Sequence, residues 1–201
     1  MQNPYQVTRD FEQTIAEYTG APYVVCVNSG TVALQLAVMW TMPGQGLSYV
    51  EIPRRTYVSV PNAISRAGYS VTWRDEDWHG IYQLWPVPVF DCALRFTSDM
   101  YRTGQFQCVS FAAAKILGIE QGGAILHDNA AADAWLRRMR FDGRTEGVDP
   151  MEDTFDLVAL HCIMLPSIAA QGLLRLHHLP KHNADKVQTY PDLSRFAETW
   201  R

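Results

Sequence analysis

One lysine of this chain stands in sequence that is typical of a protein interior. The 201 residues include three lysines, and the other two lie in polar sequence near the end. Lys115 follows the apolar run 106–111 and is flanked by Ala, Ile and Leu. Burying an ammonium group is costly unless the group is paired or its pKa falls. A lysine that deprotonates easily can act as a nucleophile and form a Schiff base, whereas a lysine in a partly buried loop can also simply snorkel to the surface.

A candidate anion site follows the first apolar run of the chain. Residues 22–27 are nearly all apolar, as expected for a buried parallel strand, and helix-like sequence occupies 32–42. Ser29, Gly30 and Thr31 lie between them. A strand, a small-residue turn and a helix together point free backbone N–H groups at an anion. Gly30 permits close approach and Thr31 adds a hydroxyl, so the turn predicts a phosphate site; a plain helix N-cap is the alternative.

A carboxylate follows another short apolar run. Asp91 comes directly after residues 86–90, and ligand sites of open α/β sheets gather at the carboxyl ends of strands, although a turn residue or helix cap is a common alternative. The Ser110 hydroxyl precedes Lys115 by five residues. Pyridoxal 5'-phosphate needs this set: donors for its phosphate, a lysine for its aldehyde and a carboxylate that keeps its pyridine nitrogen protonated. An aromatic ring such as that of Tyr57 would hold the cofactor flat by stacking.

Short strands alternate with helices along most of the chain, which argues for an α/β fold with a mostly parallel sheet. The segment 78–85 has no clear pattern. Residues 155–179 predict a largely helical stretch interrupted near Pro166, and the polar residues 180–201 predict a loosely packed tail. The expected strands are 22–27, 47–52, 69–73, 86–90, 106–111 and 124–127, and the expected helices are 8–19, 32–42, 57–67 and 133–141. Thr8 is the expected N-cap of the first helix and Gly20 its stop, and Asn129 or Asp128 is the expected cap of the last helix.

Composition and charge narrow the class of protein. The net charge is −4 and no run of Lys or Arg exceeds two residues, which argues against a nucleic-acid or membrane-surface partner. No apolar stretch is long enough to span a bilayer, and residues 1–13 lack the basic and then apolar pattern of a signal peptide. The cysteines form no CxxC motif, so neither a zinc site nor a disulfide framework is indicated, and we expect a cytoplasmic protein with reduced thiols. They are Cys26, Cys92, Cys108 and Cys162.

These residues and their order resemble the DegT/DnrJ/StrS sugar aminotransferases, which have the type I fold of pyridoxal-phosphate enzymes. The matching elements are a phosphate-binding turn, a P-x-x-T-aromatic element, an Asp element, and a Schiff-base motif in which S-F-x-x-x-K is followed by G-G. They are found at Ser29 to Leu34, at Pro53 to Tyr57, at Val89 to Ala93, and at Ser110, Phe111, Lys115, Gly122 and Gly123; Arg140, Gly143 and Arg144 resemble a later R-x-x-G-R stretch.

The resemblance implies a fold, a site and a partner. The fold would be the three-layer α/β large domain of these enzymes, with 1–180 binding pyridoxal phosphate and 181–201 as a polar tail. Lys115 would form the Schiff base and carry protons, and Asp91 would contact the pyridine nitrogen. Family members are homodimers with sites shared at the interface, and their substrates are keto sugars carried by nucleotides. The implied cofactor contacts are Ser29, Gly30, Thr31, Tyr57, Asp91, Ser110, Lys115 and His161.

The chain also departs from the family pattern. Leu94 stands where the family has Gln or His, and Ala112 replaces a His or Tyr. His161 and Ile163 stand where the family has the Asn and Arg of an N-Y-R-M motif, and that Asn usually reaches the phosphate of the partner subunit's cofactor. His161 keeps a hydrogen-bonding group there, whereas Ile163 cannot replace the Arg. The chain stops shortly after the helix that follows, so the resemblance implies that the C-terminal small domain, which helps close the site, is absent or reduced.

Four functions compete. The resemblance favours an aminotransferase that moves an amino group, with glutamate as the expected donor, to a nucleotide-linked keto sugar. A shortened, phage-encoded pyridoxal-phosphate enzyme with other chemistry, such as decarboxylation or hypermodification of DNA bases, is the second; the acidic net charge argues against a DNA substrate. A non-catalytic binding subunit is the third, although it would not need a costly buried lysine. The fourth, a Rossmann-type nucleotide binder, would need the G-x-G-x-x-G that the chain lacks after its first strand.

Overall fold

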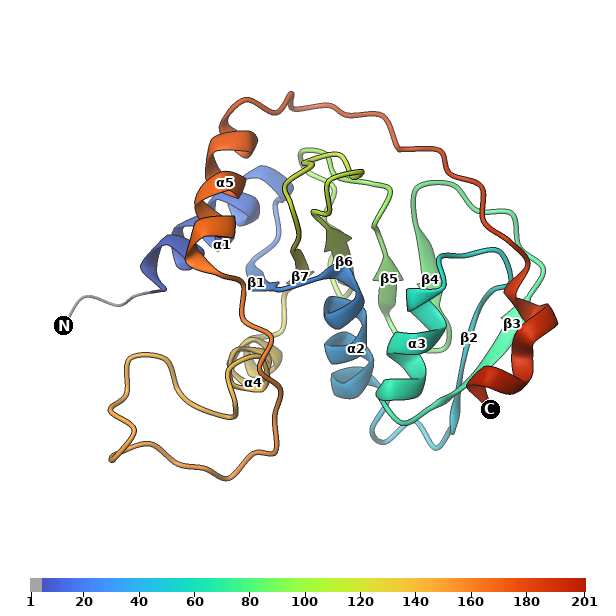
Figure 1. Ribbon diagram of the computed structural model, residues 1–201, viewed down its shortest axis with the longest axis horizontal. Helices are drawn as coiled ribbons and strands as arrows, with labels where there is room; N and C mark the ends of the chain where they lie inside the picture. Colours follow the sequence, from blue (N-terminus) through green and yellow to red (C-terminus); the bar gives the residue numbers. More distant parts are fainter. Residues whose placement is uncertain (1–4) are drawn as a thin grey trace.

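A mixed β-sheet forms the centre of this computed structural model, which describes residues 5–201 (Figure 1). Five strands run in the order β1-β7-β6-β5-β4, and β2 and β3 form a parallel pair. An antiparallel bridge between Glu51 and Trp85 joins this pair to the end of β4. The strands are β1 (Tyr23–Val27), β2 (Tyr49–Pro53), β3 (Ser70–Arg74), β4 (Tyr82–Leu84), β5 (Val89–Asp91), β6 (Phe106–Ser110) and β7 (Gly123–His127).

The predicted α/β fold is confirmed, and its sheet contains more antiparallel pairs than expected. Strands β5 and β6 pair in parallel, whereas the pairs β1–β7, β6–β7 and β4–β5 are antiparallel. Parallel neighbours need a crossover connection of about a dozen residues or more, usually a helix. Only residues 85–88 separate β4 from β5, too few for a crossover, and the loop 111–122 returns the chain directly from β6 to its antiparallel neighbour β7.

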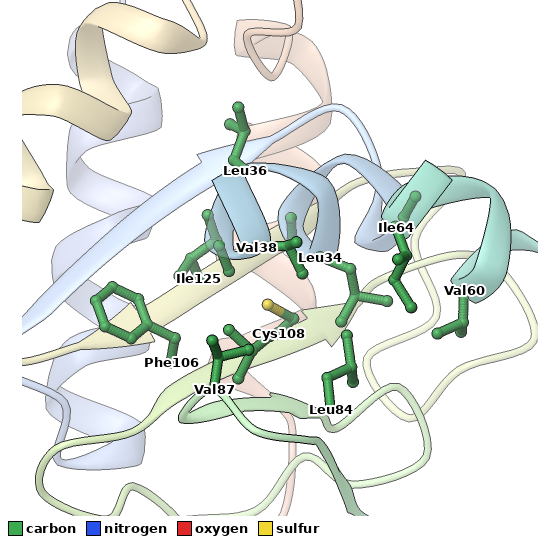
Figure 2. Packing of buried hydrophobic residues seen from close by; sticks show 14 of the residues in the cluster. Leu34, Leu36, Val38, Val60, Ile64, Leu84, Val87, Phe106, Cys108 and Ile125 are labelled. Atoms are coloured by element: carbon green, nitrogen blue, oxygen red, sulfur yellow. The ribbon is translucent and has the colours of Figure 1, made fainter. Parts of the chain in front are cut away.

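Helices cover both faces of the sheet, which explains why its strands are apolar on both sides. Val25 belongs to the core under α2, α3 and α4, whereas the next residue, Cys26, belongs to the core under α1 and α5. Figure 2 shows part of the first core, where Leu34 of α2 lies between Cys108 of β6 and Val60 of α3. The helices are α1 (Gln6–Thr19), α2 (Gly30–Thr41), α3 (Ser59–Arg66), α4 (Ala130–Met139), α5 (Pro166–His177) and the 3-10 helix η1 (Leu193–Trp200).

Local sequence sets most helix ends as expected, with small shifts. Gly20 ends α1 in the left-handed conformation, at a φ of 78°. Thr8 lies buried inside α1, which begins two residues earlier, so the prediction that Thr8 is the N-cap is wrong. Ser29 and Asn129 are the N-caps of α2 and α4, because the side chain of each accepts a hydrogen bond from a backbone N–H of the first turn.

The helix expected over 155–179 is wrong in its first half. Only Pro166–His177 are helical, with proline at the first position, where its missing N–H costs nothing. Residues 155–165 form no helix because their backbone groups bond to distant segments; the N–H of Cys162, for example, donates to the carbonyl of Arg140 at 3.0 Å. A local apolar pattern cannot reveal such a long-range bond.

The expectation of a loosely packed tail over 180–201 is also wrong. Leu193 and Trp200 are 4% and 6% exposed, and both belong to the core under α2 and α3. The indole N–H of Trp200 donates to Asn62 Oδ1 at 2.7 Å. Two buried apolar residues in polar sequence therefore anchor the end of the segment. The boundary expected at residue 180 itself stays a prediction.

Two further observations concern membrane-spanning helices and the cysteine thiols. Across residues 5–201, no helix is both long and apolar enough to cross a membrane. All four cysteines are buried and unpaired. The pattern noted for the N-terminal stretch falls partly on residues 1–4, which lie outside the described residues.

Candidate active site

A cavity of about 350 Å³ lies where β5 and β6 end and α2 begins. Because β1, β5 and β6 run in the same direction, the residues that follow them meet at one edge of the sheet. The cavity brings together every predicted site residue except His161. Those that line it are Ser29, Gly30, Thr31, Tyr57, Asp91, Ser110 and Lys115.

The first turn of α2 forms part of the cavity wall. Ser29 Oγ accepts a hydrogen bond from the N–H of Val32 at 3.2 Å and caps the helix. Gly30 lies directly against the end of β6. A Cβ atom at this position would be only 2.8 Å from Ser110 Cβ, so a larger residue would not fit without a shift. Such a helix end carries N–H donors without intrahelical acceptors and a partial positive charge. Together with the hydroxyls of Thr31 and Ser110, the turn offers the donors that an anion needs.

Asp91 is a buried carboxylate held by two donors. Tyr82 Oη donates to its Oδ2 and the N–H of Ala93 donates to its Oδ1, both at 2.8 Å. Thr56 Oγ1 lies 2.5 Å from Tyr82 Oη and extends the network. Burial raises the pKa of Asp91, while the two hydrogen bonds and the charge of Lys115 lower it. The carboxylate is therefore fixed in place and would gain from a cationic partner in the cavity.

Lys115 lies half-buried on the loop that follows β6. Its N–H donates to the carbonyl of Ala112 at 2.8 Å, which closes a turn just before it. Burial lowers the pKa of Lys115; Asp91 opposes this effect, and the charge of Lys186 adds to it. Within residues 5–201 its Nζ has no hydrogen-bond partner. An amine that is less basic and unpartnered is suited to act as a nucleophile.

A family model matches this chain over residues 1–81 and 98–197. It is the model of the DegT/DnrJ/EryC1/StrS aminotransferase family. The chain belongs to this family. The resemblance derived from the motifs is thereby confirmed, and an unrelated Rossmann-type nucleotide binder is excluded.

Solved structures share the fold of this DegT/DnrJ/EryC1/StrS member. AtS13 from Actinomadura melliaura has a TM-score of 0.76 at 22% identity, covering 87% of this chain and 60% of that one. The sugar aminotransferase CalS13 from Micromonospora echinospora has a TM-score of 0.69 at 20% identity, with coverages of 85% and 61%. NtdA from Bacillus subtilis, with bound cofactor PMP, has a TM-score of 0.68 at 18% identity, with coverages of 86% and 48%. The chain thus spans 48% to 61% of these three structures. No curated protein sequence matches it.

The sequence analysis of this family member missed three side chains that line the cavity and one that supports it. Trp78 lines the cavity and Tyr82 holds Asp91, and both come from the segment without a clear pattern. The alternation that places Tyr82 on β4 was a strand signal that could have been recognised. Gln188 and Tyr190 also line the cavity. They come from polar sequence near the end of the chain, where no local signal marks them.

His161 is not part of this cavity. It is exposed, and its Nδ1 lies 2.6 Å from Asp142 Oδ2. Its expected family role concerns the cofactor of a partner subunit, so that role stays a prediction. Among the departures from the family pattern, Leu94 and Ala112 line the cavity, whereas Ile163 is buried elsewhere, in a bridge with β1.

Proposed function

We propose that this chain is a pyridoxal-phosphate-dependent aminotransferase that moves an amino group from glutamate to the keto group of a nucleotide-linked sugar. The observation that carries the proposal is the convergence of Lys115, Asp91 and the first turn of α2 on one cavity, in a member of an aminotransferase family. NtdA is described with bound cofactor PMP, which supports pyridoxal phosphate as the cofactor of this chain. CalS13 is described as a sugar aminotransferase, which supports a sugar as the substrate class.

The donor set of the cavity fits this cofactor. When bound, pyridoxal phosphate supplies an aldehyde that condenses with amines and a ring that withdraws electrons from the reacting carbon. Ser29, Gly30, Thr31 and Ser110 supply hydroxyls and a helix N-terminus for its phosphate. Tyr57 is 53% exposed and offers an aromatic face for stacking against the ring.

Asp91 and Lys115 divide the proton chemistry between them. The Asp91 carboxylate would hold a proton on the ring nitrogen, because a buried carboxylate favours a cationic partner. Lys115 Nζ would hold the cofactor through its aldehyde, and the lowered pKa of Lys115 leaves more of the amine unprotonated near neutral pH. As a free amine, the same nitrogen would serve as the base that moves a proton between the substrate carbon and the cofactor.

We also propose that the enzyme is a homodimer in the cytoplasm. Residues 145–161 form an extended surface segment (Figure 1) that exposes three large apolar side chains: Met151, Phe155 and Val158 are 92%, 68% and 97% exposed. A group of exposed apolar side chains is typical of an interaction surface. His161 lies in the same segment, so a second copy bound there would bring it to a shared site. The buried, unpaired thiols agree with a reducing compartment.

The test is an absorption spectrum of the purified protein with added pyridoxal phosphate. It is recorded for the wild type, for Lys115→Ala and for Lys181→Ala. Lys181 is exposed and lies outside the cavity, so its variant controls for non-specific reaction of the aldehyde with lysines. We expect a visible band in the wild type and in Lys181→Ala that Lys115→Ala lacks. Glutamate should bleach this band.

The alternatives give different results in the same experiment. A decarboxylase would release CO₂ from its amino acid and keep the band. A Lys115-dependent band that glutamate leaves unchanged would point to another amino donor or another reaction. A non-catalytic subunit would show no Lys115-dependent band, and that result would overturn the proposed function.

A further inference from the structure

Residues 180–192 form a strap that connects α5 to η1 without a helix or strand of its own. Figure 1 shows the strap crossing above the central strands, from α5 on one side to η1 beside β3 on the other. Hydrogen bonds hold both of its ends. The N–H of Ser98 donates to the carbonyl of Lys181, and the N–H of Leu193 donates to the carbonyl of Arg54, both at 2.8 Å. The strap is therefore held against the body of the protein and does not sample a free coil.

An ion pair fixes the middle of the strap. Arg95 Nε and Nη2 donate to the two oxygens of Asp185 at 2.9 and 2.6 Å. His79 Nδ1 lies 3.3 Å from the same carboxylate. Gly80 leaves room for it, because a Cβ atom on Gly80 would be 1.9 Å from Asp185 Oδ2. A bidentate pair fixes direction as well as distance, so the next residue of the strap, Lys186, reaches a defined place.

Lys186 links the strap to the loop that carries Lys115. Its Nζ donates to the carbonyl of Ala114 at 2.6 Å, and its backbone N–H donates to the carbonyl of Leu94 at 2.8 Å. The first acceptor belongs to the residue just before Lys115. The Lys186 charge is close enough to lower the pKa of Lys115. One side chain therefore both holds the loop and acts on its amine.

Tyr190 closes the cavity from the strap side. Its side chain is 9% exposed, its ring stacks on Trp78 with centroids 5.9 Å apart, and it lies 6.2 Å from the ring of Tyr57. Its Oη donates to Gln188 Oε1 at 3.0 Å. Burial raises the pKa of Tyr190 to about 12, with a further contribution from Asp91, so its hydroxyl stays protonated near neutral pH. The strap thus supplies a neutral aromatic ring and the side chain of Gln188 to one side of the cavity.

We propose that Lys186 is a positioning residue that latches the strap to the Lys115 loop and keeps Tyr190 in place as the cover of the cavity. The part of this inference that concerns the cofactor rests on the proposed function. The latch itself depends only on the contacts of the protein chain. The two parts can therefore be tested separately, first without the cofactor and then with it.

The first experiment tests the latch in cofactor-free protein. Wild type, Lys186→Gln, Lys186→Arg and the matched control Lys181→Gln are digested with proteinase K, and cleavage within 180–192 is followed by mass spectrometry. Loss of one charge-assisted hydrogen bond at the surface should favour strap opening about fivefold, so Lys186→Gln should be cut about fivefold faster than wild type. Lys186→Arg keeps a charged donor and should stay within about twofold of wild type. Within residues 5–201 the Lys181 side chain has no hydrogen-bond or ion-pair partner, so Lys181→Gln should match wild type.

The second experiment tests the cover in protein loaded with pyridoxal phosphate. The decay of the Lys115-dependent visible band is timed after addition of hydroxylamine, which captures accessible carbonyl groups. We expect decay about fivefold faster in Lys186→Gln, and at least as fast in Tyr190→Ala, because both open the cavity. The pH dependence of band formation should also shift to higher pH in Lys186→Gln, since loss of a nearby positive charge raises the pKa of Lys115. A merely structural contact would not move this profile.

The two possible failures are distinguishable. A wild type without a Lys115-dependent band refutes the proposed function, and the digestion still decides the latch. A normal wild-type band with Lys186→Gln indistinguishable from Lys181→Gln in digestion, capture and pH profile overturns the latch and leaves the proposed function standing.

Discussion

Removing one hydroxyl group, in Tyr82→Phe, should weaken both the fold and the site. Tyr82 Oη donates to Asp91 Oδ2 at 2.8 Å and lies 2.5 Å from Thr56 Oγ1. All three side chains are buried, at 3%, 6% and 1% exposed. The variant keeps the aromatic ring and its contact with Trp78, whose ring centroid lies 4.6 Å away. It leaves a buried carboxylate oxygen and a buried hydroxyl without this partner.

The magnitude follows from the two lost hydrogen bonds. A bond to a charged group contributes about 1.5–3 kcal/mol and a neutral one about 1 kcal/mol, so the free energy of unfolding should fall by about 2–4 kcal/mol at neutral pH. Part of this cost depends on pH. Burial holds the pKa of Asp91 above its ordinary value of 3.8, and the bond from Tyr82 lowers it.

The sign of the pH dependence follows from that shift. A carboxyl group whose pKa is raised in the folded state stabilises the fold fully below its ordinary pKa and loses this contribution as pH rises through the folded pKa. Removing the Tyr82 bond raises the folded pKa of Asp91 further. The cost of Tyr82→Phe should therefore be larger at neutral pH than below pH 3.8.

The assay is urea unfolding, followed by circular dichroism at neutral and acid pH. Tyr23→Phe is the matched control, because the Tyr23 hydroxyl makes no hydrogen bond within the described chain and its ring stacks on His127 at 5.6 Å. Its cost should stay within about 0.5 kcal/mol. If Tyr82→Phe costs no more than Tyr23→Phe, or the same at both pH values, the hydrogen bonds assigned to Tyr82 do not stabilise the fold.

Three further changes test other parts of the structure. Gly123→Ala should lower the free energy of unfolding in urea by about 1–3 kcal/mol, because its Cβ would be 2.5 Å from the backbone nitrogen of Gly30. Arg140→Met should cost about 3–5 kcal/mol in thermal unfolding, because it removes a buried guanidinium that pairs with Oε1 of the buried Glu12 and with Glu146, while Arg137 pairs with the other Glu12 oxygen. Burial lowers the pKa of His127 from 6.5 to about 4, so its neutral form stabilises the fold above pH 6.5 and that contribution is lost as pH falls through about 4. The difference corresponds to about 3 kcal/mol, and His127→Phe should remove this part of the acid sensitivity in urea titrations.

Each of these changes has a result that would contradict it. Arg138→Met is the control for Arg140→Met, because the ion-pair partner of Arg138, Asp156, is 68% exposed and solvent screens this pair, so the variant should cost much less than Arg140→Met. Equal costs for the two arginines would refute the buried ion pair. A fully stable Gly123→Ala would show that the turn before α2 can move away from β7. If the free energy of unfolding depends on pH in the same way in wild type and in His127→Phe, His127 does not contribute to the acid sensitivity.

The wrong expectations about the fold have separate causes. Residues 155–165 have apolar side chains but no helix, because their backbone bonds to segments near α4, and a single sequence does not show such long-range contacts. The sheet contains more antiparallel pairs than expected because the connections 85–88 and 111–122 return the chain directly to the neighbouring strand.

The sequence by itself determined which residues end each strand, and therefore the chemical set of Gly30, Asp91 and Lys115. An apolar run and the turn that follows it are local properties, and strands that run in the same direction bring their ends to one edge. Only the tertiary structure decided what closes the cavity. Tyr190 and Lys186 come from extended polar sequence without periodicity, and Lys186 reaches a carbonyl 72 residues away along the chain. Their position depends on anchors at both ends of the strap, and those anchors exist only once the sheet has assembled.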